Sequence, residues 1–203
     1  MYTQKNKNSS SYLIDPINIT DFNQSDDQLE TSIIFWILAA GKNGVTSAKC
    51  LNGFLNSWAM ALADVYLSPF EIMREVDEKG ILAEELKNFG IGCNNMKAGY
   101  IRDLINSDID LRKCTVDELE AIKGIGPKTA RCFLIHSRKN QQYAGLDTHI
   151  LKFLKDQGHP VPKATPTGKK YKELEQIFLG LAKDAKKSVA EFDLSIWNEY
   201  RNK

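Results

Sequence analysis

The residues whose types and spacing are best suited to chemistry lie within residues 119–151. The turn Gly124–Pro127 reads GIGP, with two glycines around one apolar residue, and Lys128 follows it at the start of a predicted helix. Two glycines allow the backbone to turn sharply and to approach another surface closely. Pro127 suits the first position of a helix, where a missing N–H costs little. The free N–H groups at this helix start, with the positive end of the helix dipole, predict a site for an anion.

The charge of this stretch favours a nucleic-acid phosphate as the anion. Between Ala121 and Leu146 the sequence has five basic residues and no acidic residue. The basic residues are Lys123, Lys128, Arg131, Arg138 and Lys139. Basic side chains that neutralise phosphates supply much of the affinity of proteins for DNA. We expect DNA contacts from the backbone at Gly124 and Gly126, and from the side chains of Lys128 and Arg131.

A carboxylate follows the turn at a defined distance. Asp147 lies 19 residues after Lys128 (147 − 128) and directly before Thr148 and His149. Breaking the bond between a base and its sugar builds positive charge on the sugar, and a nearby carboxylate stabilises that charge. An Asp in this position is also a good N-cap for the helix that follows. Both roles are compatible, because a cap would hold the carboxylate in one orientation.

The hairpin, the Lys and the Asp together resemble the helix-hairpin-helix DNA glycosylases, the superfamily of endonuclease III and 8-oxoguanine DNA glycosylase. The resemblance covers residues 85–155. Its essential Asp lies in an Asp-Thr-His or Asp-Val-His sequence, which Asp147 and the next two residues match. Bifunctional members carry a Lys just after the second hairpin glycine, as Lys128 does. The resemblance implies that Lys128 attacks C1′ as a neutral amine and forms a Schiff base, whose β-elimination cleaves the strand; phosphate binding by Lys128 is the alternative.

The resemblance also implies residues that read an extruded base. In the 8-oxoguanine enzymes a Cys one turn after the Lys lines the base pocket; Cys132 has this position, and His136 continues the same helix face. A small core residue is the alternative for Cys132. The C-terminal segment is similar to the small archaeal-type 8-oxoguanine glycosylases, in which an aromatic residue helps to read the base. Trp197 is the candidate aromatic, with a core position as its alternative, and His149 is expected to support phosphate contacts or hydrogen bonds of the active site.

A turn near the N-terminus is the expected place of the residue that fills the gap left by the base. In the superfamily this polar residue follows the first core helix, where the present sequence has Lys42 and Asn43. The Ser-Gln or Thr-Gln sequence that is usual in the superfamily at this turn is absent. A solvent-exposed turn, with a helix end at Gly41, is therefore the alternative.

Cofactors are expected to be few. Many relatives of endonuclease III carry an iron–sulfur cluster on four cysteines after the catalytic Asp, whereas this chain has no Cys after Cys132. No cysteine spacing matches a zinc site, and no His or carboxylate lies at ligand spacing from His149. By resemblance, the hairpin carbonyls of Glu120, Ile122 and Ile125 hold a structural Na⁺ or K⁺ ion.

The elements that position these residues are predicted to be helices. No segment alternates in the manner of a strand, so the fold class is all-α. The resemblance implies two helical lobes, with a helix-hairpin-helix motif and the active site in the cleft between them. Lobe one is expected to span about 29–136 and lobe two 12–28 plus 137–203. Residues 1–11 are polar and are expected to form a mobile tail.

The bulk composition is that of an ordinary globular protein. A net charge of +1 shows that the expected DNA-binding charge is local rather than global. We expect an intracellular monomer (cytoplasm or nucleoid, or nucleus) without a membrane span, because the first eleven residues are polar and the apolar run 33–40 is short.

The predicted function is a DNA glycosylase with AP lyase activity, removing 8-oxoguanine or another modified base from double-stranded DNA. One alternative is an enzyme of the same fold that acts on hypermodified bases. Another is a non-catalytic helix-hairpin-helix DNA-binding module, which would need neither Lys128 nor Asp147.

Overall fold

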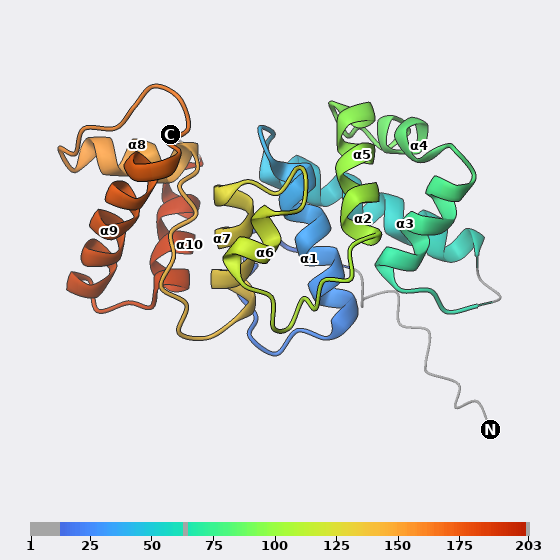
Figure 1. The fold of residues 1–203 in the computed structure, drawn as a ribbon, viewed down its shortest axis with the longest axis horizontal. Helices are drawn as coiled ribbons and strands as arrows, with labels where there is room; N and C mark the ends of the chain where they lie inside the picture. Colours follow the sequence, from blue (N-terminus) through green and yellow to red (C-terminus); the bar gives the residue numbers. More distant parts are fainter. Residues whose placement is uncertain (1–12, 63–64, 202–203) are drawn as a thin grey trace. The chain divides into compact units, whose positions relative to one another are not determined.

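A computed structural model describes residues 13–62 and 65–201, and its regular structure there is entirely helical (Figure 1). The predicted all-α fold class is confirmed. The expected mobile tail, residues 1–11, lies outside the described residues. No helix in the described ranges is long and apolar enough to cross a membrane. The helices are α1 (Asp26–Ala39), α2 (Gly44–Ala61), α3 (Pro69–Glu78), α4 (Leu82–Asn88), α5 (Asn94–Ile105), α6 (Val116–Glu120), α7 (Pro127–Ser137), α8 (Thr148–Asp156), α9 (Gly168–Asp184) and α10 (Val189–Tyr200).

The chain forms two compact units, and their boundary differs from the expected lobes. The first unit contains residues 13–15 and Ser25–Leu111, with α1 to α5; the second contains Pro16–Gln24 and the chain from Arg112 onward, with α6 to α10. The sequence placed residues 112–136 with the first lobe and residues 12–28 with the second. The structure places residues 112–136 in the second unit, because α7 packs against α10 and is joined to α9 by a buried ion pair. Of residues 13–28, only Pro16–Gln24 belong to the second unit.

The first unit is built around α1, which packs against α2, α3 and α5. Apolar side chains occur around nearly the whole of this helix, and Ile33, Ile34 and Leu38 are fully buried. A helix that is apolar all round is stable only when neighbours cover it on every side. The helix begins at Asp26, where Ser25 and Gln28 form a capping box.

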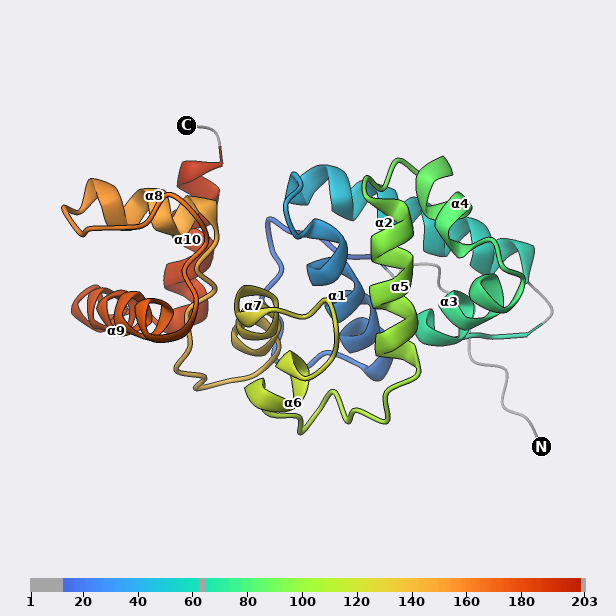
Figure 2. The ribbon, with the colours of Figure 1, turned by 45° about the horizontal axis from the view of Figure 1, so that its top comes forward.

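The second unit has its apolar core between α8, α9 and α10, where α10 lies beside the other two helices (Figure 2). Ile150 and Leu154 of α8 meet Phe178 of α9 and Ile196 of α10 in this core. The α6–α7 hairpin joins this assembly through α7. The candidate site residues Lys128 and Asp147 both belong to this unit.

A buried ionic network fixes α7 to its surroundings. Arg131 is only 7% exposed, and its Nε donates to the Glu175 carboxylate at 2.8 Å. Its guanidinium also pairs with Glu120 of α6 and lies 4.7 Å from the ring centre of Tyr171. The same Glu175 oxygen accepts the backbone N–H of Ala144 at 2.9 Å. One carboxylate therefore holds both α7 and the segment that leads to Asp147.

We predict that Glu175→Ala lowers the free energy of unfolding by about 3–5 kcal/mol, because it removes one partner of a buried ion pair and the acceptor of a buried N–H. The measurement is urea denaturation. The matched control is Glu173→Ala on the same helix, which removes an exposed pair with Lys170 and should cost at most about 1 kcal/mol. Equal losses for the two variants would contradict the anchoring role of Glu175.

Candidate active site

The turn between α6 and α7 is shaped by its two glycines. Gly124 has φ +94°, in the left-handed region that favours glycine, and the N–H of Ile125 donates to the carbonyl of Ile122 at 3.0 Å. Ile125 is 3% exposed and anchors the turn in the interior. Gly126 is the extended N-cap residue of α7, and it has no side chain to occupy the first N–H groups of the helix. The anion site that the sequence predicts at this helix start remains a prediction.

Lys128 and Asp147 are brought to one site from the starts of two helices. Lys128 is the second residue of α7 and is partly buried. Asp147 is the N-cap of α8, and its Oδ1 accepts the N–H groups of His149 and Ile150 at 2.8 and 2.9 Å. The charge of Lys128 acts on the carboxylate of Asp147 and lowers its proton affinity. The predicted capping role of Asp147 is confirmed, and the cap fixes the carboxylate near Lys128.

Burial raises the pKa of Asp147 above its ordinary value. The loss of hydration is the largest cause, and the buried carboxylate of Asp193 raises the pKa further. Lys128 and the N–H of Ile150 act in the opposite direction but do not cancel these effects. Asp147 therefore binds a proton more readily than an exposed Asp, which suits a residue that accepts a proton from a neighbouring amine.

Cys132 lies one helical turn after Lys128 and is 2% exposed. Burial raises the pKa of its thiol, while the charge of Lys128 opposes the shift. Its Sγ occupies the space where a side chain at Gly145 would begin. A glycine is therefore required at position 145, because α7 and the segment before Asp147 approach each other closely here.

Tyr171, which no sequence pattern singles out, orders the segment that leads to Asp147. The hydroxyl of Tyr171 donates to the carbonyl of Ala144 at 2.6 Å and accepts the N–H of Leu146 at 3.2 Å. Both bonds are buried. They order the segment just before Asp147, so that α9 contributes to the position of the carboxylate.

His136 does not line a base pocket, and this part of the sequence prediction is corrected. The residue is 1% exposed, with Nδ1 at 2.7 Å from the Thr20 hydroxyl and Nε2 at 3.2 Å from the Asp193 carboxylate. The N–H of Asp21 donates to its carbonyl oxygen at 3.0 Å. His136 thus ties the segment 16–24 to α10. The shared helix face misled the prediction, because His136 is buried against Thr20 and Asp193, which are distant in the sequence.

Arg131 is also corrected as a predicted phosphate ligand. Its guanidinium is enclosed by Glu120, Glu175 and Tyr171. A side chain held by two carboxylates inside the unit has no reach to a phosphate outside it. The acid-free sequence around it concealed this, since its carboxylate partners come from α6 and α9.

His149 and Trp197 form an aromatic edge beside Asp147. Their ring centres lie 6.1 Å apart and their planes meet at 88°. Trp197 is partly buried, and the guanidinium of Arg201 lies 5.3 Å from its ring centre. The structure therefore brings Trp197 next to His149, and its role in reading the base remains a prediction.

The predicted gap-filling residues belong to the first unit. Lys42 and Asn43 are exposed on the turn between α1 and α2, and Gly41 has φ +68°. The side chain of Asn43 accepts the N–H of Thr46 at 3.0 Å and caps α2. The alternative of an exposed turn thus describes the local structure, and a role in DNA remains a prediction.

The four cysteines are free thiols. Within the described ranges, no group of three or more His, Cys, Asp or Glu side chains could hold a metal ion. The carbonyl of Ile122, one of the expected ligands of a monovalent ion, accepts the N–H of Ile125. A carbonyl oxygen has a second lone pair, so this bond is compatible with an ion.

Comparisons with known proteins point to one family. Residues 19–187 match the family model described as 8-oxoguanine DNA glycosylase. The 8-oxoguanine DNA glycosylase/AP lyase of Metallosphaera sedula is 31% identical over 145 residues, which are 65% of this chain and 68% of the relative. The enzyme of the same name from Methanocaldococcus jannaschii is 32% identical over 57% of this chain and 60% of the relative. The chain thus spans somewhat more than half the length of these relatives.

Solved structures give the same result over a larger share of the chain. The M. jannaschii 8-oxoguanine glycosylase/lyase in complex with a 15mer DNA containing 8-oxoguanine has a TM-score of 0.69 and 26% identity, covering 92% of this chain and 88% of that one. The 8-oxoguanine DNA glycosylase of Thermotoga maritima has a TM-score of 0.67 and 25% identity, covering 89% and 83%.

We predict that Gly145→Ala destabilises the protein by about 1–3 kcal/mol, because the new methyl group overlaps the Sγ of Cys132. The same substitution in a Cys132→Ala background should cost much less, since the overlapping atom is absent. Urea denaturation of the four proteins of this double-mutant cycle measures the coupling. Additive effects would show that the two residues do not share this space.

We predict that Asp147→Asn stabilises the folded protein at neutral pH. The pKa of Asp147 is higher in the folded state than its ordinary value of 3.8. Wild type therefore loses stability as the pH rises from 3.8 through the pKa of the folded state. Asn keeps the N-cap and has no charge to bury. Urea denaturation should show a gain for the variant at pH 7 that vanishes below pH 3.8, where both side chains are neutral. A loss of stability at pH 7 would contradict the buried, proton-binding carboxylate.

Proposed function

Since the chain belongs to the 8-oxoguanine DNA glycosylase family, we propose that it excises 8-oxoguanine from double-stranded DNA and cleaves the strand at the resulting abasic site. The observation that carries the proposal is the meeting of Lys128 with the capped carboxylate of Asp147 at the start of two helices. Both residues lie inside the matched range 19–187.

Family membership confirms the helix-hairpin-helix glycosylase superfamily predicted from the sequence. It also confirms the predicted class of activity, a DNA glycosylase with AP lyase activity. The residues that carry the activity in this chain are part of the proposal.

Lys128 is the nucleophile in this proposal. Its neutral amine, having given a proton to Asp147, forms a bond to C1′ while the bond from C1′ to the base breaks. The departing base takes the bonding electron pair and receives that proton from Asp147. Opening of the sugar ring gives a Schiff base between C1′ and Lys128. Loss of a proton from C2′ then expels the 3′ phosphate, which cleaves the strand.

Asp147 has two tasks in the same steps. Its raised pKa favours proton uptake, so it first receives the proton that Lys128 must lose to become a nucleophile. Once it has passed this proton to the departing base, it is an anion and stabilises the positive charge on the sugar. Two backbone N–H groups of α8 hold the carboxylate in place for both tasks.

The remaining contacts to DNA are assigned by position. The backbone at Gly124 and Gly126, at the N-terminal end of α7, binds phosphate, and His149 supports this contact. Cys132 and Trp197 border the base. Extruding a base costs a few kcal/mol, so the duplex needs a residue to fill the gap.

Lys42 or Asn43 takes this gap-filling role.

The carbonyls of Glu120, Ile122 and Ile125 hold a Na⁺ or K⁺ ion that stiffens the hairpin. The protein acts as a monomer inside the cell, where its DNA substrate lies.

The test is borohydride trapping on a duplex with a single 8-oxoguanine, and on one with an abasic site. Wild type should form a covalent adduct with both, and Lys128→Gln with neither. Asp147→Asn should reduce the excision rate by orders of magnitude while the protein stays folded. A Lys128→Arg control keeps the charge and should bind DNA without forming an adduct.

Two outcomes would contradict the proposal. Trapping by Lys128→Gln at the wild-type rate would remove Lys128 from the nucleophile role. Trapping on the abasic duplex, without excision of 8-oxoguanine opposite any base, would assign a different modified base as the substrate.

A further inference from the structure

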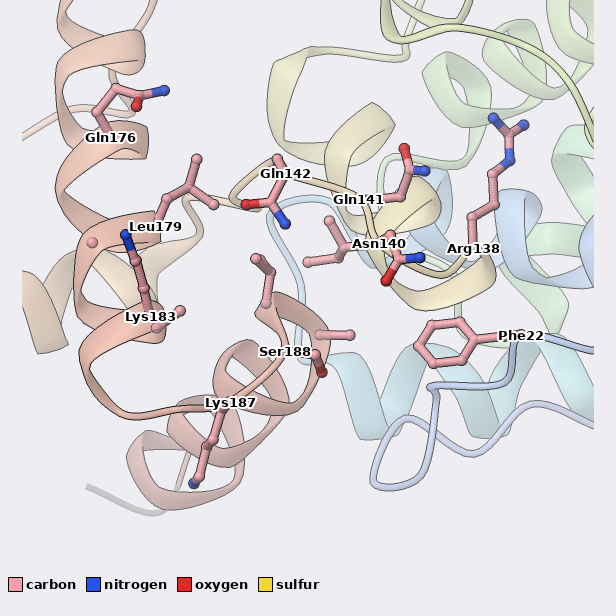
Figure 3. A pocket seen from close by; sticks show the side chains of 15 residues that line it. Phe22, Arg138, Asn140, Gln141, Gln142, Gln176, Leu179, Lys183, Lys187 and Ser188 are labelled. Carbon is pink, nitrogen blue, oxygen red and sulfur yellow. The ribbon is translucent and has the colours of Figure 1, made fainter.

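A cleft of about 630 Å³ lies in the second unit, away from the proposed catalytic residues. Its walls are the C-terminal end of α7, the linker that follows it, the end of α9 and the start of α10 (Figure 3). Lys128 lies at the other end of α7. Arg138, which lines the cleft, is ten residues further on, about 15 Å along the helix axis. The volume is in the range of small-molecule sites.

The cleft carries an excess of positive charge. Arg138, Lys183 and Lys187 line it, and no Asp or Glu belongs to its lining. The nearby Glu191 accepts from the backbone N–H and the hydroxyl of Ser188, and the charge of Lys187 also acts on its carboxylate. Arg138 donates to the carbonyl of Cys114 from a fixed position, and its charge also acts on the exposed carboxylate of Glu118. Lys183 and Lys187 are exposed and can move towards a ligand.

Four carboxamides supply hydrogen-bonding groups of both kinds. Asn140, Gln141 and Gln142 come from the linker after α7, and Gln176 comes from α9. The linker amides and Lys183 border the cleft from opposite sides (Figure 3). A carboxamide has one acceptor and two donors, so it can pair with the edge of a nucleobase.

The floor of the cleft is apolar. Ile135, Val189 and Ala190 are buried there, and the partly buried ring of Phe22 stands at one edge. An aromatic ring beside an apolar floor suits the flat face of a base, and stacking of this kind tolerates any base.

We propose that this cleft binds an unpaired nucleotide, with the base against Phe22 and the carboxamides and the phosphate at Lys183 and Lys187. The ligand is a free mononucleotide or an unpaired nucleotide of a strand, since both offer a base and a phosphate. The site is separate from the catalytic residues, and its occupation does not require that the chain excise 8-oxoguanine.

Calorimetric titration of the full chain with 2′-deoxyadenosine 5′-monophosphate tests the proposal. Wild type should bind it saturably, and 2-deoxyribose 5-phosphate and inorganic phosphate should bind more weakly. Lys183→Gln with Lys187→Gln should weaken the nucleotide on the order of tenfold and reduce its salt dependence. The matched control, Lys169→Gln with Lys172→Gln, changes the same charge on exposed positions of α9 and should bind as wild type.

Further titrations distinguish a free nucleotide from a nucleotide of a strand, and they test whether the nucleotide binds at the catalytic residues instead of the cleft. A trinucleotide that binds more tightly than the mononucleotide indicates a strand, and the reverse order indicates a free nucleotide; both support the cleft. Lys128→Gln should keep nucleotide binding, and the cleft variant should keep the excision rate. No saturable binding by wild type overturns the proposal. The proposal is also overturned if inorganic phosphate binds as tightly as the nucleotide, or if the control variant weakens nucleotide binding as much as the cleft variant does. Loss of nucleotide binding in Lys128→Gln would overturn it as well.

Discussion

One carboxylate oxygen sets the distance between the two proposed catalytic residues. Oε1 of Glu175 accepts from Arg131 on α7 and from the N–H of Ala144, three residues before Asp147. Lys128 is on the first turn of α7, so its position follows from that of Arg131. A buried carboxylate with two donors is stable only in one geometry, because each lost bond leaves an unsatisfied group in the interior. The Lys and the Asp are thus held in register by a residue that does not take part in the chemistry.

The close approach of Cys132 to Gly145 works in the same direction. The bonds of Glu175 and Tyr171 pull the segment before Asp147 onto the rest of the unit, and the missing side chain at Gly145 lets it come within contact of α7. The result is a carboxylate that is buried beside a lysine and beside a second buried carboxylate, Asp193. Such an arrangement costs stability in the folded state, and proteins keep unfavourable charges of this kind where they serve a reaction.

Much of the fold and the core of the site could be predicted from local sequence. Glycine and proline indicate the hairpin, and capping residues indicate the helix starts. The chemistry was predicted from the resemblance of the Lys and Asp positions to those of the bifunctional glycosylases. The errors concern side chains whose partners are distant in the chain. Arg131 has its carboxylates on α6 and α9, and His136 has Thr20 and Asp193 as neighbours. Pairing between residues that are distant in the chain leaves no periodic pattern in a single sequence. The boundary between the two units is equally hard to predict, because it depends on which helices α7 packs against.

In residues 121–146, which contain no acidic residue, the arginines and the lysines have different roles. Both arginines are used inside the protein: Arg131 pairs with carboxylates, and Arg138 donates to the carbonyl of Cys114. Lys123 and Lys139 are exposed. A guanidinium has a planar set of donors that matches fixed partners, whereas an ammonium on a flexible stem suits a partner that arrives from solvent. A local count of charge therefore overestimates the contacts available to DNA, and the proposed phosphate contacts rest on the hairpin backbone and His149.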